Sequence, residues 1–512
     1  MATAARGRAG GDRTIRCCLL GLGLLLGDAA AAAQGWRITP GVTVRGTATD
    51  NVDLAPDDRK QSDFITEIAP SIRIDGGGGR VKLHLAYQLD GIIHARDSSR
   101  NEIQNTLDAF GTAEVVDNFM FVDVRGTIAQ EVISPFGPRS PSSANFNANR
   151  TESRTFQVSP YVRGQIRGFA DYTVRYSVTD FRSSAGGDNS RLKEISAGLK
   201  GDSSYSQLGW GIDVFSQKTE FAQSPDSQQD RARGHLTYGI SPQFHVSSTV
   251  GVERNDFVAF EKITETTYGA GFGWAPSERT TVTGNWEHRF FGNGWDYSVS
   301  HRRPLLAFSF TGRRDAESDA QRASSRGSGI SFDLLFNALT TRIPDPAQRA
   351  VEVQRLLQQG GIPADLNLPS DFLTNGIFIN SDMQASVAIL GSRNTTAFSI
   401  HHTKREQLRR TDSFAGAAVN PDVTEYGASG AFSHQLSPLS SMTAILTWQR
   451  SMSAANGDLG SRQWDARLLY TTRFGPKTSG SLEFRHVRFT SDLGSSADYS
   501  ENALTASLLV LF

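Results

Sequence analysis

Residues 501–512, ENALTASLLVLF, alternate along their length between two faces. Successive side chains of an extended strand point to opposite sides, so each face carries every second residue. One face holds Leu504, Ala506, Leu508, Val510 and Phe512, and the other holds Ala503, Thr505, Ser507, Leu509 and Leu511. A soluble protein seldom places an exposed aromatic residue at the tip of such a strand. We therefore expect the face that ends in Phe512 to lie against an apolar environment.

The same period of two recurs through most of the chain. Clear examples are RVKLHLAYQLD (80–90), FMFVDVRGTI (119–128), DYTVRYSVTD (171–180), TVTGNWEHRF (281–290) and WDARLLYTTRF (464–474). Each segment has one apolar and one polar face, which predicts strands that are buried on one side only.

The connections between these strands alternate in length. Short turns at 76–79, 117–118 and 241–243 alternate with longer polar stretches such as 50–62 and 135–150. A soluble antiparallel sheet explains the two faces, but it does not explain this alternation, which is typical of outer-membrane barrels. We therefore predict an all-β fold, a transmembrane antiparallel up-and-down barrel of about 22 strands, within a range of roughly 20 to 24.

A membrane-spanning sheet must also close, because lipid offers no partner for the backbone groups of an edge strand. We expect the strand in 501–512 to pair with WRITPGVTVRG (36–46) on one side and with SLEFRHVRF (481–489) on the other. Leu508, Val510 and Phe512 are then the candidate C-terminal assembly signal, which the bacterial barrel assembly machinery would recognise.

The polar faces of the strands supply the candidate lumen-lining residues. These are Lys82, His84, Gln88, Asp123, Arg125, Arg175, Asn285, Glu287, Arg289, Arg467 and Arg473. Basic residues outnumber acidic ones in this set, and rings of charge tune the selectivity of pores. The set is compatible with a path for a polar or anionic solute, and equally with a wet interior that has no selectivity.

Residues 1–33 have the features of a secretory signal peptide. Basic residues precede the apolar run CCLLGLGLLLG (17–27), and DAAAAAQG (28–35) offers small residues for cleavage after Ala33. Lipidation of Cys18 is the alternative, but RTIR (13–16) is basic where an apolar run should precede the lipidated residue. Both cysteines lie in this segment, so we expect no disulfide in the remaining chain, which we interpret as a single barrel over 34–512.

Composition excludes two classes of protein. After the signal segment, no apolar run approaches the roughly 18 residues that a membrane helix requires. The formal net charge is −1, from 52 basic and 53 acidic residues. A nucleic-acid-binding protein usually carries a basic patch or a strongly basic domain, so we expect no nucleic-acid partner.

One region breaks the period of two. In IPDPAQRAVEVQRLLQQGGIP (343–363), Asp345 is a candidate N-cap, Pro346 suits the first turn, and Gly360–Gly361 can end a helix. We predict one short helix at 345–359, inside a long extracellular connection at about 312–374. Its apolar stripe, which includes Val351, needs a surface to pack on, which favours an inward or rim position.

Three blocks of the sequence resemble the outer-membrane proteins associated with PEP-CTERM (exosortase) systems, found with exopolysaccharide clusters. The blocks begin GVTVRGTATDNVDL (41–54), SPFGPRSPSSANFN (134–147) and PDPAQRAVEVQRLL (344–357). The resemblance implies a bacterial outer-membrane location and possible periplasmic partners, namely polysaccharide or export components. It implies no active site, because the family is known largely as barrels of unassigned role.

No pattern of residues indicates an enzyme. Serines and histidines are numerous, but no spacing singles out a nucleophile and its base. His401 and His402 point to opposite faces of one strand, which suits no metal site, and RIDGGGGRV (73–81) lacks the Lys-Ser/Thr of a phosphate-binding loop. We expect no catalytic residues, no metal and no cofactor.

Two functions lead, and an outer-membrane enzyme is the third alternative. The first is an outer-membrane barrel for passage or export of a polar solute, plausibly associated with exopolysaccharide, with membrane lipid as its surroundings. The second is a structural or surface-adhesion barrel with a blocked lumen and no transport.

Overall fold

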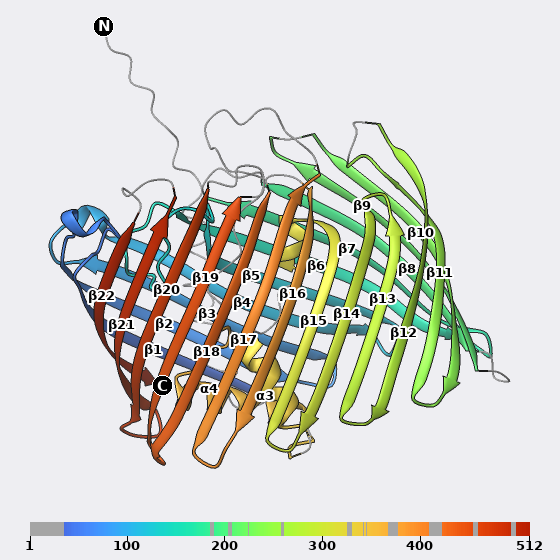
Figure 1. The fold of residues 1–512 in the computed structure, drawn as a ribbon. Helices are drawn as coiled ribbons and strands as arrows, with labels where there is room; N and C mark the ends of the chain where they lie inside the picture. Colours follow the sequence, from blue (N-terminus) through green and yellow to red (C-terminus); the bar gives the residue numbers. More distant parts are fainter. Residues whose placement is uncertain are drawn as a thin grey trace, which may run out of the picture.

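The computed structural model describes residues 35–184, 189–202, 207–223, 225–257, 261–324, 330–340, 342–344, 346–366, 377–408, 422–453, 459–492 and 498–512. Twenty-two antiparallel strands form one sheet, and the last strand pairs with the first. Figure 1 shows the strands running obliquely around the closed wall. The predicted barrel and the predicted strand number are confirmed. The predicted signal segment and its cysteines lie outside the described residues.

Each strand pairs with its neighbours in sequence. The strands are β1 (Trp36–Thr49), β2 (Asp63–Gly77), β3 (Val81–His94), β4 (Glu102–Val116), β5 (Met120–Val132), β6 (Arg150–Ile166), β7 (Ala170–Ser183), β8 (Ser190–Asp202), β9 (Leu208–Phe221), β10 (Ser227–Ser241), β11 (Phe244–Asn255), β12 (Ile263–Ser277), β13 (Thr280–Arg289), β14 (Gly292–Arg303), β15 (Leu306–Ser318), β16 (Ile377–Leu390), β17 (Asn394–Gln407), β18 (Val423–Ser437), β19 (Ser440–Ser453), β20 (Gly460–Arg473), β21 (Thr478–Ser491) and β22 (Tyr499–Leu511).

The two ends of the barrel differ in the length of their connections. At the end that holds the start of β1 and the end of β22, the connections are short, as between β18 and β19 or between β16 and β17. At the other end lie long connections, including 50–62 between β1 and β2, 133–149 between β5 and β6, and 319–376 between β15 and β16. We call these the short-turn end and the long-loop end.

Apolar side chains cover the outside of the wall, and polar ones line the inside. Phe64, Val250 and Leu446 are more than half exposed on the outer face. Inward-facing Glu253 and Glu501, by contrast, are almost fully buried. In water, so much exposed apolar surface would be unfavourable. The apolar outer face therefore suits a lipid environment.

The seam between β1 and β22 closes the barrel. The register runs from Gly41 opposite Leu511 to Thr49 opposite Ala503, and β21 lies on the other side of β22 as expected. Leu508 pairs with Val44, Val510 pairs with Val42, and the backbone N–H of Phe512 donates to the Pro40 carbonyl at 2.9 Å. The Phe512 side chain is 64% exposed at the short-turn end, outside the wall.

Several glycines in the strands make room for a ring on the neighbouring strand. A Cβ at Gly76 would overlap the indole of Trp36, and a Cβ at Gly427 would overlap the imidazole of His401. Such close cover of a strand glycine by a ring is a known way to hold strands in register. Some of the many glycines of this chain therefore serve to accommodate rings from neighbouring strands.

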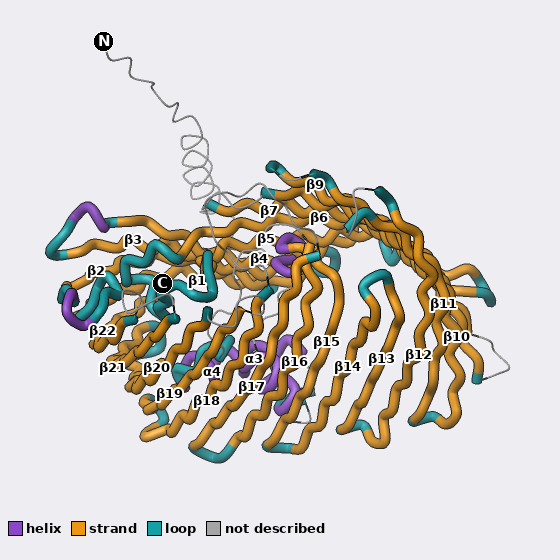
Figure 2. Tube along the Cα trace, turned by 45° about the horizontal axis from the view of Figure 1, so that its top comes forward, coloured by secondary structure: helices purple, strands orange, loops and turns teal. Residues whose placement is uncertain are grey.

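Among the described residues of the connection between β15 and β16, three segments are helical. They are α2 (Asp319–Ser324), α3 (Ile330–Ala338) and α4 (Pro346–Gly360). Two 3-10 turns, η2 (Asp57–Arg59) and η3 (Ser98–Arg100), lie in other long connections. The prediction of a single helix at 345–359 is therefore incomplete, although α4 matches it closely; Asp345 lies outside the described residues. Figure 2 shows α3 and α4 inside the barrel.

The end of α4 is set by Gly361. Its φ of 62° is in the left-handed region, which favours glycine. The N–H of Ile362 donates to the Leu357 carbonyl at 3.0 Å, and the N–H of Gly361 donates to the Gln358 carbonyl at 3.3 Å. This is a Schellman ending, in which Leu357 and Ile362 also meet in the same apolar cluster.

Candidate functional site

The connection 133–149 between β5 and β6 folds across the lumen at the long-loop end, and we call it the strap. Its Arg139 donates to the Ser451 hydroxyl at 2.8 Å and lies 3.6 Å from the Glu425 carboxylate on β18. Ser461 of β20 donates to the Pro135 carbonyl at 2.8 Å. The strap therefore joins β5 and β6 to strands on the far side of the barrel.

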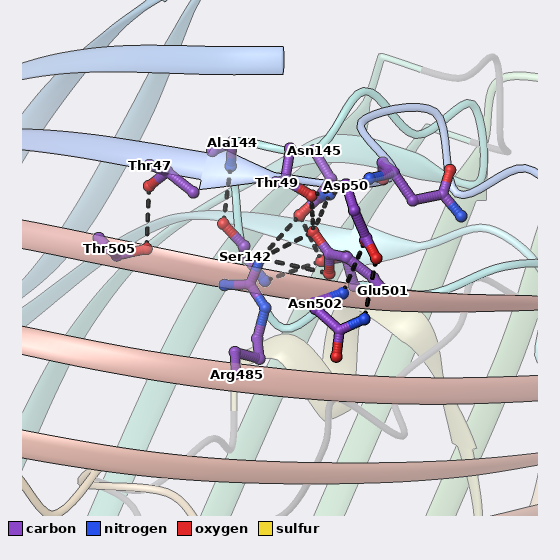
Figure 3. Close-up of polar contacts among 12 residues, drawn as sticks. Thr47, Thr49, Asp50, Ser142, Ala144, Asn145, Arg485, Glu501, Asn502 and Thr505 are labelled. Carbon is purple, nitrogen blue, oxygen red and sulfur yellow. Dashed lines mark hydrogen bonds and ion pairs between the residues drawn. The ribbon is translucent and has the colours of Figure 1, made fainter. Parts of the chain in front are cut away.

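A second set of contacts fixes the strap beside the seam, as Figure 3 shows. The Asn145 amide donates to Glu501 of β22 at 2.6 Å, and its carbonyl accepts from Arg485 of β21 at 3.2 Å. Glu501 also accepts from Arg485 at 3.1 Å and from the Thr49 hydroxyl of β1 at 2.8 Å. One buried carboxylate thus links the strap, the last two strands and the first strand.

Apolar contacts add little to the strap. Phe136 packs against Val423, and Ala144 packs with Val52 and Ile65. Most of the attachment is therefore polar, made by buried groups whose removal would leave partners unsatisfied.

The described residues of 319–366, in the connection between β15 and β16, form the second inward segment, which we call the helical segment. Its α3 contacts β14, β15 and β16, whereas α4 contacts β18, β19 and β20. The two helices and the chain after α4 share one apolar cluster, made by Leu334, Leu335, Ala338, Leu339, Val353, Leu357, Ile362 and Leu366. The wall beneath them contributes four alanines together with Leu390 and Ile445; the alanines are Ala307, Ala388, Ala397 and Ala431. Small wall residues leave space for the larger side chains of the helices.

The helical segment reaches deep into the lumen. The Gly360 carbonyl accepts from Ser433 of β18 at 3.1 Å and from Thr443 of β19, both close to the short turn between these strands. The α4 stripe differs from the prediction, because Val353 is fully buried whereas Val351 is 48% exposed. The predicted inward position of the helix agrees with these contacts.

Helix α2 crosses the upper lumen from β15 toward β6, β7 and β8. Ala320 and Ala323 pack with Phe181 of β7 and Leu192 of β8. The Gln321 amide donates to Gln217 of β9 at 2.6 Å. This short helix therefore joins two parts of the wall that are distant in the strand order.

The described residues enclose a larger and a smaller cavity in the lumen. The first, of 1260 Å³, is lined by strap residues such as Ser142, by helical-segment residues such as Asp333, and by strands β1 to β5, β14 to β17 and β20 to β22. The second, of 440 Å³, is lined by strands β9 to β15. Asp296 and Arg313 line both, so the two spaces adjoin. The first cavity lies between the two inward segments.

The first cavity carries both signs of charge equally. Its lining includes eight arginines, Arg45, Arg139, Arg150, Arg313, Arg322, Arg405, Arg467 and Arg485, and eight carboxylates, Glu67, Asp90, Glu131, Asp296, Asp333, Asp365, Asp382 and Glu483. The basic excess in the sequence-derived set is therefore not a property of this cavity.

The sequence-derived residues are spread around the wall rather than gathered in one place. Gln88 and Arg467 line the first cavity; Asn285, Glu287 and Arg289 line the second.

The others lie outside both cavity linings. Arg175 pairs with Asp123 at 2.8 Å, Arg125 donates to the Ser324 carbonyl of α2, and Arg473 donates to the Pro438 carbonyl at 3.2 Å, in a short turn.

His84 contacts Asp75 at 2.6 Å, and Lys82 sits opposite Gly77. Of the two adjacent histidines, His401 lines the first cavity, and the ring of His402 lies tilted against that of Tyr426, with 4.7 Å between the ring centroids.

Sequence reasoning missed the residues that hold the strap. Glu425, Arg485 and Glu501 sit at inward positions of alternating strands, so the period of two could have included them in the lumen set. Arg139 and Asn145 lie in a connection without periodicity, and nothing local indicates that Asn145 meets a residue 356 positions away.

Burial shifts the pKa of two groups in the inward segments. Loss of solvent lowers the pKa of the Arg139 guanidinium, and the nearby Glu425 carboxylate opposes this shift. Burial raises the pKa of Asp333 in α3, and the neighbouring Asp365 carboxylate raises it further. Asp333 therefore takes up a proton more readily than an ordinary aspartate.

Within the described ranges, no group of three or more histidine, cysteine, aspartate or glutamate side chains could hold a metal ion. None of the helices in the described part of the chain is long and apolar enough to cross a membrane.

No family model and no curated protein matches the chain. Three solved structures with similar folds are the siderophore receptor PirA of Pseudomonas aeruginosa (9% identity, 93% of this chain and 80% of that chain, TM-score 0.42), the FrpB iron transporter of Neisseria meningitidis (10%, 94% and 83%, 0.47) and OpdK of Pseudomonas aeruginosa with vanillate (8%, 93% and 99%, 0.34). At these values the likeness carries no functional argument, and the fold rests on the strand pairing of this chain.

Proposed function

We propose that the protein is a bacterial outer-membrane barrel that passes or exports a polar solute through a lumen narrowed by the strap and the helical segment. The observation that carries this proposal is the polar cavity of 1260 Å³ inside a closed wall whose outer face is apolar. A closed sheet with this polarity is stable in lipid, because every wall strand has two partners. The interior has room for water and a solute between the two segments.

The association with exopolysaccharide and with PEP-CTERM systems is the finer part of the proposal. It is supported by the three sequence blocks given above, two of which correspond to the strap and the helical segment. The chain would then carry out no catalysis, and its partners would be the barrel assembly machinery and export components in the periplasm.

Single-channel recording in planar bilayers tests passage. Steady conductance of the folded protein in potassium chloride, with unboiled protein migrating differently from boiled protein on a gel, is the expected result. Folded protein that inserts into the bilayer and shows no conductance would overturn the proposal.

A structural barrel with a blocked lumen is the second candidate. The observation in its favour is that both inward segments cross the lumen and are attached to the wall at several points. In that case, loosening either segment would create conductance that the native protein lacks, whereas a passage barrel conducts before any change.

A further inference from the structure

The second cavity contains an arginine, Arg231, whose guanidinium forms no ion pair with any described carboxylate. Arg231 of β10 points into this cavity and is partly buried. Its side chain makes no hydrogen bond and no ion pair with the described residues. Its guanidinium lies over the ring of Phe215 on β9, whose centroid is 5.4 Å from the guanidinium carbon. A partly desolvated cation without a partner is costly, and an anion would recover part of that cost.

The other arginines of this cavity are paired. Arg233 binds Glu287 at 3.1 Å, and Arg313 binds Asp315 at 2.9 Å. The lack of an ion pair is therefore particular to Arg231 and is not shared by these other inward-facing arginines.

The neighbouring strand explains why Arg231 lacks a partner. In the register of β10 and β11, Arg231 lies opposite Glu253, the natural carboxylate for it. Both oxygens of Glu253 are already taken, because Arg289 of β13 donates to them at 2.9 and 3.0 Å and Gln229 donates to the first. Two arginines thus compete for one carboxylate, and Arg289 makes the bidentate pair.

The remaining carboxylates of the cavity attract Arg231 only from a distance, because other groups bind them or they are exposed. Asp213 is 3.3 Å from the His235 ring, Glu287 is bound to Arg233, and Asp315 is bound to Arg289. The Asp296 carboxylate makes no hydrogen bond with a described residue, but it is exposed at the junction of the two cavities, where water screens it.

We propose that the Arg231 guanidinium is an anion-binding subsite of the second cavity, which takes an oxyanion group of the solute. A guanidinium presents paired N–H groups that match a carboxylate, sulfate or phosphate. The ring of Phe215 covers part of the guanidinium and leaves its other N–H groups for a ligand. This inference rests on the proposed function, since it names the chemistry of the solute that would pass this point.

Calorimetric titration of the folded barrel in detergent, with inorganic phosphate and separately with acetate, tests the subsite without requiring transport. The variants are Arg231→Gln, which removes the charge, and Arg231→Lys, which keeps the charge but removes the fork. Arg254→Gln is the matched control, because Arg254 is exposed on the outer face of the adjacent β11 and makes no described contact.

We expect saturable binding of at least one anion to the native barrel. Arg231→Gln should weaken it roughly tenfold or more, Arg231→Lys should weaken it less, and Arg254→Gln should leave it unchanged. Tighter binding of phosphate would assign a tetrahedral oxyanion, and tighter binding of acetate a carboxylate. No binding to the native barrel, or equal binding to Arg231→Gln, would overturn the subsite.

Conductance separates this result from the proposed function. Anion binding that depends on Arg231 in a barrel without conductance would count against passage alone. Conductance in a barrel whose anion binding ignores Arg231 would count against the subsite alone.

Discussion

The strap and the helical segment both fold into the lumen, but they are attached to the wall by different forces. The strap relies on buried polar groups, of which Arg139 and Asn145 are the main ones. The helical segment relies on a leucine-rich cluster over small wall residues such as Ala388. Polar attachment depends on a few directional contacts, whereas apolar attachment is spread over many side chains. A single substitution in the contacts of one segment should therefore loosen that segment and leave the other attached to the wall.

The largest effect is expected from Arg139→Ala. The side chain of Arg139 is buried, and its loss leaves the fully buried Glu425 without its cation. Breaking a buried pair in this way costs about 3–5 kcal/mol. We expect this loss in the free energy that holds the strap against the wall. Hydrogen exchange of the backbone amides in 133–149 should rise, while exchange in α4 stays unchanged. The control Arg154→Ala, which breaks an exposed pair with Glu152, should alter neither region.

A similar or slightly smaller effect is expected from Leu335→Ala. Leu335 is fully buried between α3 and the wall, and truncation of a buried leucine costs about 2–5 kcal/mol. Amide exchange should rise in α3 and α4 but not in the strap. Val351→Ala is the matched control, because Val351 is 48% exposed. If Leu335→Ala freed the strap as well, the two segments would be one cooperative unit and the comparison would be wrong.

Asn145→Ala should have an intermediate effect that separates the strap from the seam. Glu501 and Arg485 lose one partner each but keep each other, and Thr49 still donates to Glu501. Loss of a buried hydrogen-bonding group costs about 1–3 kcal/mol. We expect faster exchange in the strap together with an unchanged gel shift on boiling. A barrel that no longer resists detergent before boiling would show that Asn145 supports the closure itself.

The smallest effect is a pH dependence of the helical segment. The raised pKa of Asp333 means that the docked segment binds a proton more tightly than the released one. Docking is therefore favoured at low pH, and this contribution is lost as the pH rises from the ordinary aspartate value through the raised one. Asp333→Asn should remove the dependence of α3 exchange on pH in this window, after correction for intrinsic rates, and the strap should show no such change.

The sequence predicts the wall better than it predicts the contents of the lumen. The period of two predicts strands such as 80–90. The partners of 501–512 at the seam follow from the need to pair every backbone group in lipid. Helix α3 was not predicted because ISFDL (330–334), at its start, alternates apolar and polar residues as a strand would, and α2 was not predicted because it is too short to show an apolar stripe. The site contacts could not be predicted, since they join residues hundreds of positions apart.

Single-channel conductance of four proteins tests most directly the claim that the lumen is a passage narrowed by two independently attached segments. They are the native chain, Arg139→Ala, Leu335→Ala and the double variant, each first shown to be folded by its gel shift on boiling. We predict that the native barrel conducts, that each single variant conducts more, and that the double variant conducts most. A native barrel without conductance, or a double variant with the conductance of the native chain, would contradict this account.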